Sequence, residues 1–130
     1  MASILKVDEL RGIASAGDIT VTSEGGAATQ SLQQGLGKSW NHYNQSSETA
    51  VKDSFNVSSV TDEGTSQWIT NFSNNMSNAF YTVTATSDKE VVDFHDFDLE
   101  TGRYELISRN DGGTSGDSDQ NCSQVMGDLA

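Results

Sequence analysis

The sequence predicts a mainly β protein in which an extended N-terminal arm precedes one antiparallel β-sandwich. From residue 40 onward, segments rich in β-branched and aromatic side chains alternate with segments rich in Asn, Asp, Ser, Thr and Gly. The first kind favours strands and the second favours turns. The predicted strands are residues 40–43, 55–60, 67–72, 79–86, 91–97, 103–108 and 122–126. A chain of 130 residues has room for one such domain.

The alternation within the strands predicts which side chains form the core. Trp68, Thr70 and Phe72 fall on one face of their strand, and alternate residues of 79–85 do the same in the next. We expect these two strands to form a hairpin across residues 74–78. About seven strands joined by short turns are typical of a jelly-roll or immunoglobulin-like sandwich. The predicted core is Phe55, Val57, Trp68, Phe72, Tyr81 and Val83.

Residues 1–30 form the predicted arm. Two short apolar segments, 4–7 and 18–22, are expected to be strands, but they are too short to be stable alone. We therefore expect the arm to anchor the chain by packing against another protein or another copy. The apolar side chains available for this contact are Ile4, Leu5, Val7, Ile19 and Val21.

Residues 31–40 form a predicted linker, and the sandwich domain is expected to span 41–130. Leu32, Leu36 and Trp40 are spaced four apart, which would place them on one stripe of a short helix within 28–40 and suit a three-chain contact. Gly35 and Gly37 each weaken a helix by about 1 kcal/mol. The alternative is a loop that places Leu36 and Trp40 against the β domain.

The composition excludes several partners. The formal net charge is −12, from 19 acidic and 7 basic residues, which disfavours nucleic acid and anionic lipid. We find no apolar run that would insert into a membrane and no secretory signal, so we expect the protein to stay in the compartment where it is made. The lone Cys122 has no partner in the chain for a disulfide.

Catalysis and cofactor binding are not expected. The chain has two histidines, His42 and His95, and no nucleophile motif precedes His95. Acidic residues in 93–100, and Asp111, Asp117 and Asp119, offer oxygen ligands for Ca²⁺ if their loop folds back. Because their spacing is not that of an EF-hand, a solvated acidic loop is the simpler interpretation. We predict no metal, no cofactor and no enzymatic activity.

Sugar binding is an alternative for the aromatic side chains and the loops. Trp40 and Trp68 would contact sugar if exposed, although Trp is more often a core residue. The loops that would contact a glycan are 44–48, 62–65 and 110–120.

Several stretches of the chain resemble small tail-fibre-like virion proteins of marine tailed bacteriophages, including phages of cyanobacteria. The stretches are 31–40, with the sequence SLQQGLGKSW, and 52–65, with KDSFNVSSVTDEGT, followed by Trp68, Asn71, Phe72, Met76 and Asn78 to Tyr81. The openings LKVD at 5–8 and GDITV at 17–21 are similar to the attachment ends of such fibres. The resemblance covers residues 1–85; His42 and the acidic segment 88–98 depart from it.

The resemblance implies a place on the virus particle. It predicts a structural protein of the virion surface, a short homotrimeric fibre or a capsid-decoration subunit, made in the host cytoplasm and held by its arm on capsid or tail proteins. Leu32, Leu36 and Trp40 would close the threefold axis. The alternative is a tail-fibre adaptor or receptor-binding module that contacts host surface glycans.

Overall fold

The computed structural model describes residues 4–13, 19–23, 25–46, 50–89 and 91–130, without the side chains of 91 and 95–98. The described part contains strands and no helix. Residues 1–36 and 37–130 form two separate compact units. The strands are β1 (Thr20–Thr22), β2 (Thr29–Ser31), β3 (Ser39–Asn44), β4 (Ala50–Phe55), β5 (Val57–Gly64), β6 (Gln67–Phe72), β7 (Thr82–Ser87), β8 (Val91–Leu99), β9 (Arg103–Arg109) and β10 (Asn121–Met126).

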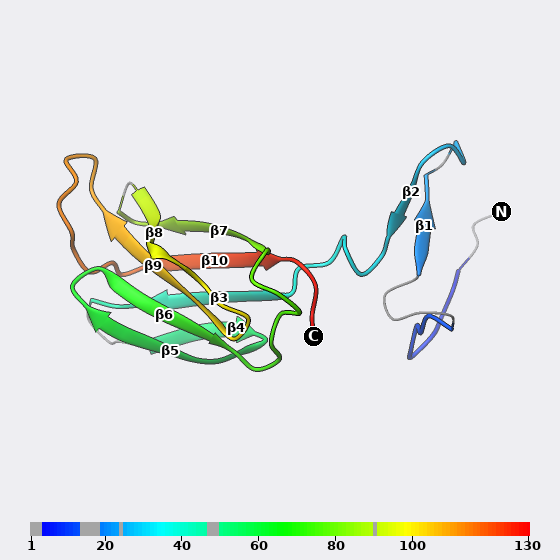
Figure 1. Ribbon diagram of the computed structural model, residues 1–130, viewed down its shortest axis with the longest axis horizontal. Coiled ribbons are helices and arrows are strands. Elements are labelled where there is room, and N and C mark those ends of the chain that lie inside the picture. The colour runs from blue at the N-terminus through cyan, green and yellow to red at the C-terminus, as the bar shows by residue number, and fades with distance from the viewer. Residues whose placement is uncertain (1–3, 14–18, 24, 47–49, 90) are drawn as a thin grey trace. The chain divides into compact units, whose positions relative to one another are not determined.

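The second unit is a sandwich of two four-stranded sheets (Figure 1). One sheet has the strand order β4-β3-β10-β7 and the other has the order β5-β6-β9-β8. All strand pairs are antiparallel. The predicted fold class, a mainly β sandwich of antiparallel sheets, is therefore confirmed. The first unit contains the two-stranded sheet of β1 and β2.

The inner faces of the two sheets form the core. Trp68, Thr70 and Phe72 are all buried, as the alternation of their strand predicted. Alternate residues of β9 and β10, among them Tyr104, Leu106 and Val125, complete the layer between the sheets. The apolar core cluster consists of Tyr43, Trp68, Phe72, Met76, Tyr81, Tyr104, Leu106 and Val125, and Val83 packs against it.

A buried polar network joins the two sheets at the centre of this core. The Asn41 side-chain amide on β3 donates to Thr70 Oγ1 at 3.0 Å and to the Tyr104 hydroxyl at 3.2 Å. That hydroxyl also shares a hydrogen bond of 2.5 Å with Ser123 Oγ on β10. Because all four residues are buried, losing one partner would leave a desolvated polar group in the core.

The predicted hairpin between residues 67–72 and 79–86 is wrong. β6 and β7 belong to different sheets, so the segment between them crosses from one sheet to the other. Phe72 and Tyr81 still meet, but across the sandwich, with ring centroids 5.6 Å apart and planes at 76°. This edge-to-face contact is favourable for aromatic rings.

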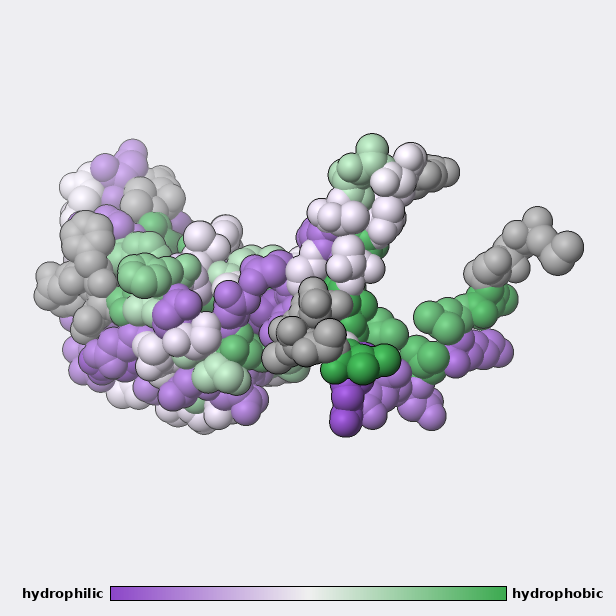
Figure 2. All heavy atoms as spheres, turned by 45° about the vertical axis from the view of Figure 1, so that its right-hand side comes forward, coloured by the Kyte–Doolittle hydropathy of each residue, from purple (hydrophilic) through white to green (hydrophobic). Residues whose placement is uncertain are grey.

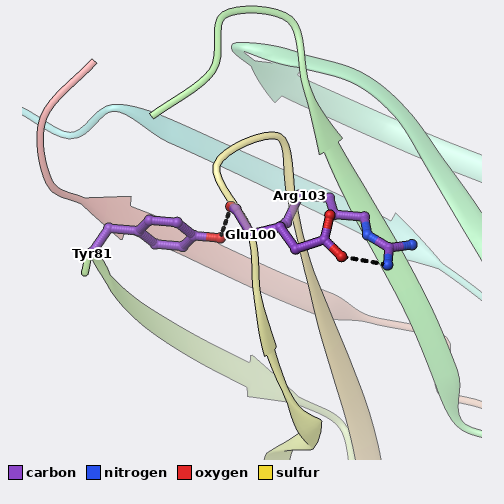
Figure 3. A network of polar contacts seen from close by, with 3 residues as sticks. All are labelled: Tyr81, Glu100 and Arg103. Atoms are coloured by element: carbon purple, nitrogen blue, oxygen red, sulfur yellow. Dashed lines mark hydrogen bonds and ion pairs between the residues drawn. The ribbon is translucent and has the colours of Figure 1, made fainter. Parts of the chain in front are cut away.

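Tyr81 also ties the crossing segment to the β8–β9 turn. Its hydroxyl lies 2.8 Å from the Glu100 carbonyl oxygen and 2.6 Å from that of Arg103. Figure 3 shows the ring directed at this turn, which Glu100 and Arg103 close with an ion pair of 2.7 Å. Burial raises the pKa of Tyr81, so its hydroxyl keeps its proton and remains a donor.

Three other local predictions are corrected. Residues 4–7 form no strand, and the short helix within 28–40 is absent; Thr29–Ser31 is a strand and 32–35 are turns. The predicted strand 55–60 is broken at Asn56, whose φ of 54° starts a new strand in the opposite sheet. Phe55 is therefore on the outer face and 54% exposed rather than in the core.

Replacing Gly127 by Ala should destabilise the sandwich. A Cβ at this position would lie 2.6 Å from Tyr81 Cβ and 3.4 Å from its backbone, so the chain after β10 would have to move. We expect a loss of about 1–3 kcal/mol in the free energy of unfolding, measured by denaturant titration. The control is Gly112→Ala, where the nearest atom would be at 3.5 Å. Equal stabilities of the two variants would contradict the prediction.

Candidate functional site

The two ends of the sandwich carry different segments of the chain. The chain enters it at residue 37, and β3 begins beside the end of β10, where Ser39 pairs with Val125. We call this the proximal end. The opposite, distal end carries the connections after β3, β5, β7 and β9 (Figure 1). The described residues of the three loops singled out in the sequence, 44–46, 62–65 and 110–120, thus belong to one end of the sandwich.

Gln45 joins two of these loops. Its side-chain amide donates to Asp62 Oδ1 at 3.1 Å, to the Gly64 carbonyl at 2.8 Å and to the Gln67 carbonyl at 2.9 Å. Its backbone amide donates to the Ser118 carbonyl at 2.9 Å. Because Gln45 is buried, these bonds fix the loops relative to the sheets.

Ser118 joins the remaining connections. Its hydroxyl accepts from Ser87 Oγ at 2.7 Å and donates to the Asp88 carboxylate, while the Asp119 amide donates to the same carboxylate at 3.2 Å. Burial opposes ionisation of Asp88, but these hydrogen bonds outweigh it and lower its pKa. The distal loops are therefore held by a continuous polar network.

The three aspartates weighed as calcium ligands are not gathered into one site. Asp117 accepts from the Ser66 backbone amide at 2.7 Å, and Asp119 pairs with the Ser46 hydroxyl. Asp111 is exposed in a turn. Among the described residues, no three His, Cys, Asp or Glu side chains are grouped so as to hold a metal ion. The carboxylates of Asp117 and Asp119 thus bond to neighbouring loops.

The structure describes the side chain of one of the two histidines. His42 lies on β3 and is partly exposed, with Cys122 of β10 opposite it. The side chains of His95, Asp96 and Asp98 lie outside the described residues, so the arrangement around them stays a prediction.

Most apolar residues assigned to the arm are exposed on the first unit, as Figure 2 also illustrates. Ile4, Leu5, Val7, Val21 and Leu36 are each at least half exposed. Ile19 and Leu32 are partly covered, and the Leu32 amide donates to the Ile19 carbonyl at 2.7 Å. A two-stranded sheet is marginally stable by itself, so this unit gains from packing on another surface.

The two tryptophans differ in environment. Trp68 is 1% exposed and belongs to the core, whereas Trp40 is 40% exposed on the outer face of its sheet. Trp40 pairs with Phe55 of β4, so the two aromatic side chains lie next to each other. The strand pattern did not predict this pair, because it placed Phe55 in the core. The break at Asn56, a residue type that tolerates positive φ, was the available signal.

Comparison with known protein families, curated proteins and solved structures found no match to this chain. The described residues include no helix long and apolar enough to cross a membrane.

All three tyrosines of the chain should resist ionisation while the protein is folded. Burial, followed by the charges of Asp62 and Asp117, raises the pKa of Tyr43 to about 12, and burial also raises the pKa values of Tyr81 and Tyr104. Above the ordinary pKa of about 10, the unfolded chain loses protons that the folded chain keeps, so stability falls as pH rises from about 10 to 12.

The measurement is tyrosinate absorbance and circular dichroism on the same alkaline titration. We expect both signals to change together, above the ordinary tyrosine pKa. Ionisation near pH 10 with unchanged circular dichroism would contradict the burial of these side chains.

Proposed function

We propose that the chain is a structural subunit of a tailed-bacteriophage particle, a short homotrimeric fibre or capsid-decoration protein held by its N-terminal arm. The proposal rests on the separation of two ends along the sandwich axis: the proximal end, where the chain enters, and the distal end, which carries the loops. The chain enters at the proximal end, and the four connections after β3, β5, β7 and β9 lie at the distal end. A subunit held through its arm would thus be attached at the end away from these loops.

The properties of the first unit support an anchoring role. Most of its large apolar side chains are exposed, which is costly for a segment that stays in water. The sandwich contains its own core and its own sheet pairing, so it needs no contribution from the arm to fold. Residues 1–85 resemble fibre-like virion proteins. This resemblance is the reason to propose that the surface holding the arm is a phage particle.

Incorporation into particles should depend on the apolar side chains of the arm. In the full chain we would replace Leu5 and Val7 by Ser, which removes apolar surface without adding charge. We expect the variant to unfold with unchanged stability but to be lost from particles assembled in its presence, measured by mass spectrometry of purified particles. The control is Glu9→Ser, which removes only an exposed ion pair with Arg11 worth at most about 1 kcal/mol. Equal incorporation of both variants would refute the anchoring role.

A second candidate function, host-glycan recognition by the distal loops, is favoured by one observation. The Gln45 and Ser118 networks hold four connections together as a preorganised surface, and preorganisation reduces the entropic cost of binding. Purified protein should then adhere to host cells, and soluble host-surface polysaccharide should displace it. If the protein does not adhere to host cells, only the structural role remains proposed.

A further inference from the structure

The outer face of the β4-β3-β10-β7 sheet differs from the rest of this acidic protein. Because the strand residues that pair with one another share a face, the register identifies its members. They are Asp53 and Phe55 of β4, Trp40 and His42 of β3, Cys122, Gln124 and Met126 of β10, and Thr82, Thr84 and Thr86 of β7. We call these ten residues the aromatic-threonine face.

The face is nearly free of charge. The chain has 19 acidic residues, and among those that the structure describes only Asp53 is placed on this face by the strand register. The outer face of the other sheet, by contrast, carries Asp93, Arg103, Glu105 and Arg109. The other 18 of the 19 acidic residues therefore lie outside the aromatic-threonine face as the register defines it.

We infer that the aromatic-threonine face is the surface by which a second copy of this chain docks. Two copies with a charge of −12 each repel wherever acidic surfaces approach, and like charges brought together at an interface cost several kcal/mol. This face lets two copies come into contact with little such cost. It also presents Trp40 and Phe55, and aromatic residues are enriched at interface centres while Asp, Glu and Lys are depleted.

The position of the aromatic pair fits copies that share an anchor. Trp40 lies three residues after Gly37, where the sandwich begins, so the pair is at the proximal end. Copies whose arms are held at one point would bring their proximal ends together first. The inference deepens the proposed function and rests on it, because a trimeric subunit needs a surface where copies meet.

The test is the solution mass of the full chain and of two lysine variants, by light scattering after size-exclusion chromatography over a range of concentrations. Phe55→Lys places a charge in the face, whereas Thr61→Lys does so at an exposed residue on the outer face of the other sheet. We expect about three times 13.9 kDa for the parent chain and for Thr61→Lys, and a three-fold lower mass for Phe55→Lys. Circular dichroism checks that both variants fold. Thr84→Lys, on the exposed side of β7, repeats the test should Phe55→Lys misfold.

Cys122 provides a readout in the native sequence, because it is exposed in the single chain and lies on the face. Its alkylation should be slow in the parent assembly and at least several-fold faster in Phe55→Lys.

A parent chain that is monomeric at every concentration would overturn the inference, and so would an oligomer that survives Phe55→Lys, since its contacts would then lie in the arm. Binding of a glycan to monomers through Trp40 would also overturn it. Incorporation into particles through the arm is measured in a separate experiment. Overturning the docking surface would therefore not contradict the anchoring role.

Discussion

The architecture depends on the insertion of the last strand, β10, between β3 and β7. β3 is the first strand of the sandwich, and β7 is separated from it by the whole of β4, β5 and β6. Without β10 the sheet β4-β3-β10-β7 would be two separate pieces, and each would expose its inner face. The pairing also brings the C-terminal residues to the proximal end, where the Ala130 amide donates to the Asn75 carbonyl and the Lys38 amide to that of Val125. Contacts of such high sequence separation cost loop-closure entropy, so we expect this sheet to complete late in folding.

The same insertion explains why the core can contain polar groups. β10 supplies Ser123, which shares a hydrogen bond with Tyr104 of the opposite sheet, and β3 supplies Asn41, which donates to that tyrosine and to Thr70. These bonds form only when β3 and β10 are adjacent over β6 and β9. Neutral hydrogen bonds contribute about 1 kcal/mol each, but their loss in the core costs more. The network therefore favours this arrangement of the sheets over other pairings of strands with similar apolar patterns.

Local pattern predicted the strands well and the sheet order poorly. Alternation is a property of single strands, so it placed Trp68 and Phe72 correctly on the inner face. It carries no information about which strands pair, and the expected β6–β7 hairpin failed because the chain crosses between sheets there. Phe55 was misplaced because the positive φ of Asn56 restarts the alternation. The turn-forming residues of 44–48, 62–65 and 110–120 predicted connections there, but Asn44 and residues 62–64 belong to strands. The Gln45 and Ser118 bonds that join the connections depend on tertiary proximity that sequence spacing does not encode.

Charge distribution connects the three surfaces for which contacts are proposed. A protein this acidic resists unspecific association, because copies repel within a Debye length of about 8 Å at physiological salt. Specific contacts are then favoured where apolar side chains are exposed. Among the described residues, these regions include the apolar series of the first unit, with Leu5 and Val7, and the aromatic-threonine face, which carries one acidic residue, Asp53. The distal loops keep their carboxylates, among them Asp62 and Asp88, in hydrogen bonds to neighbouring loops. Repulsion at this end and attraction near the arm would together orient copies in one direction, with their distal ends apart.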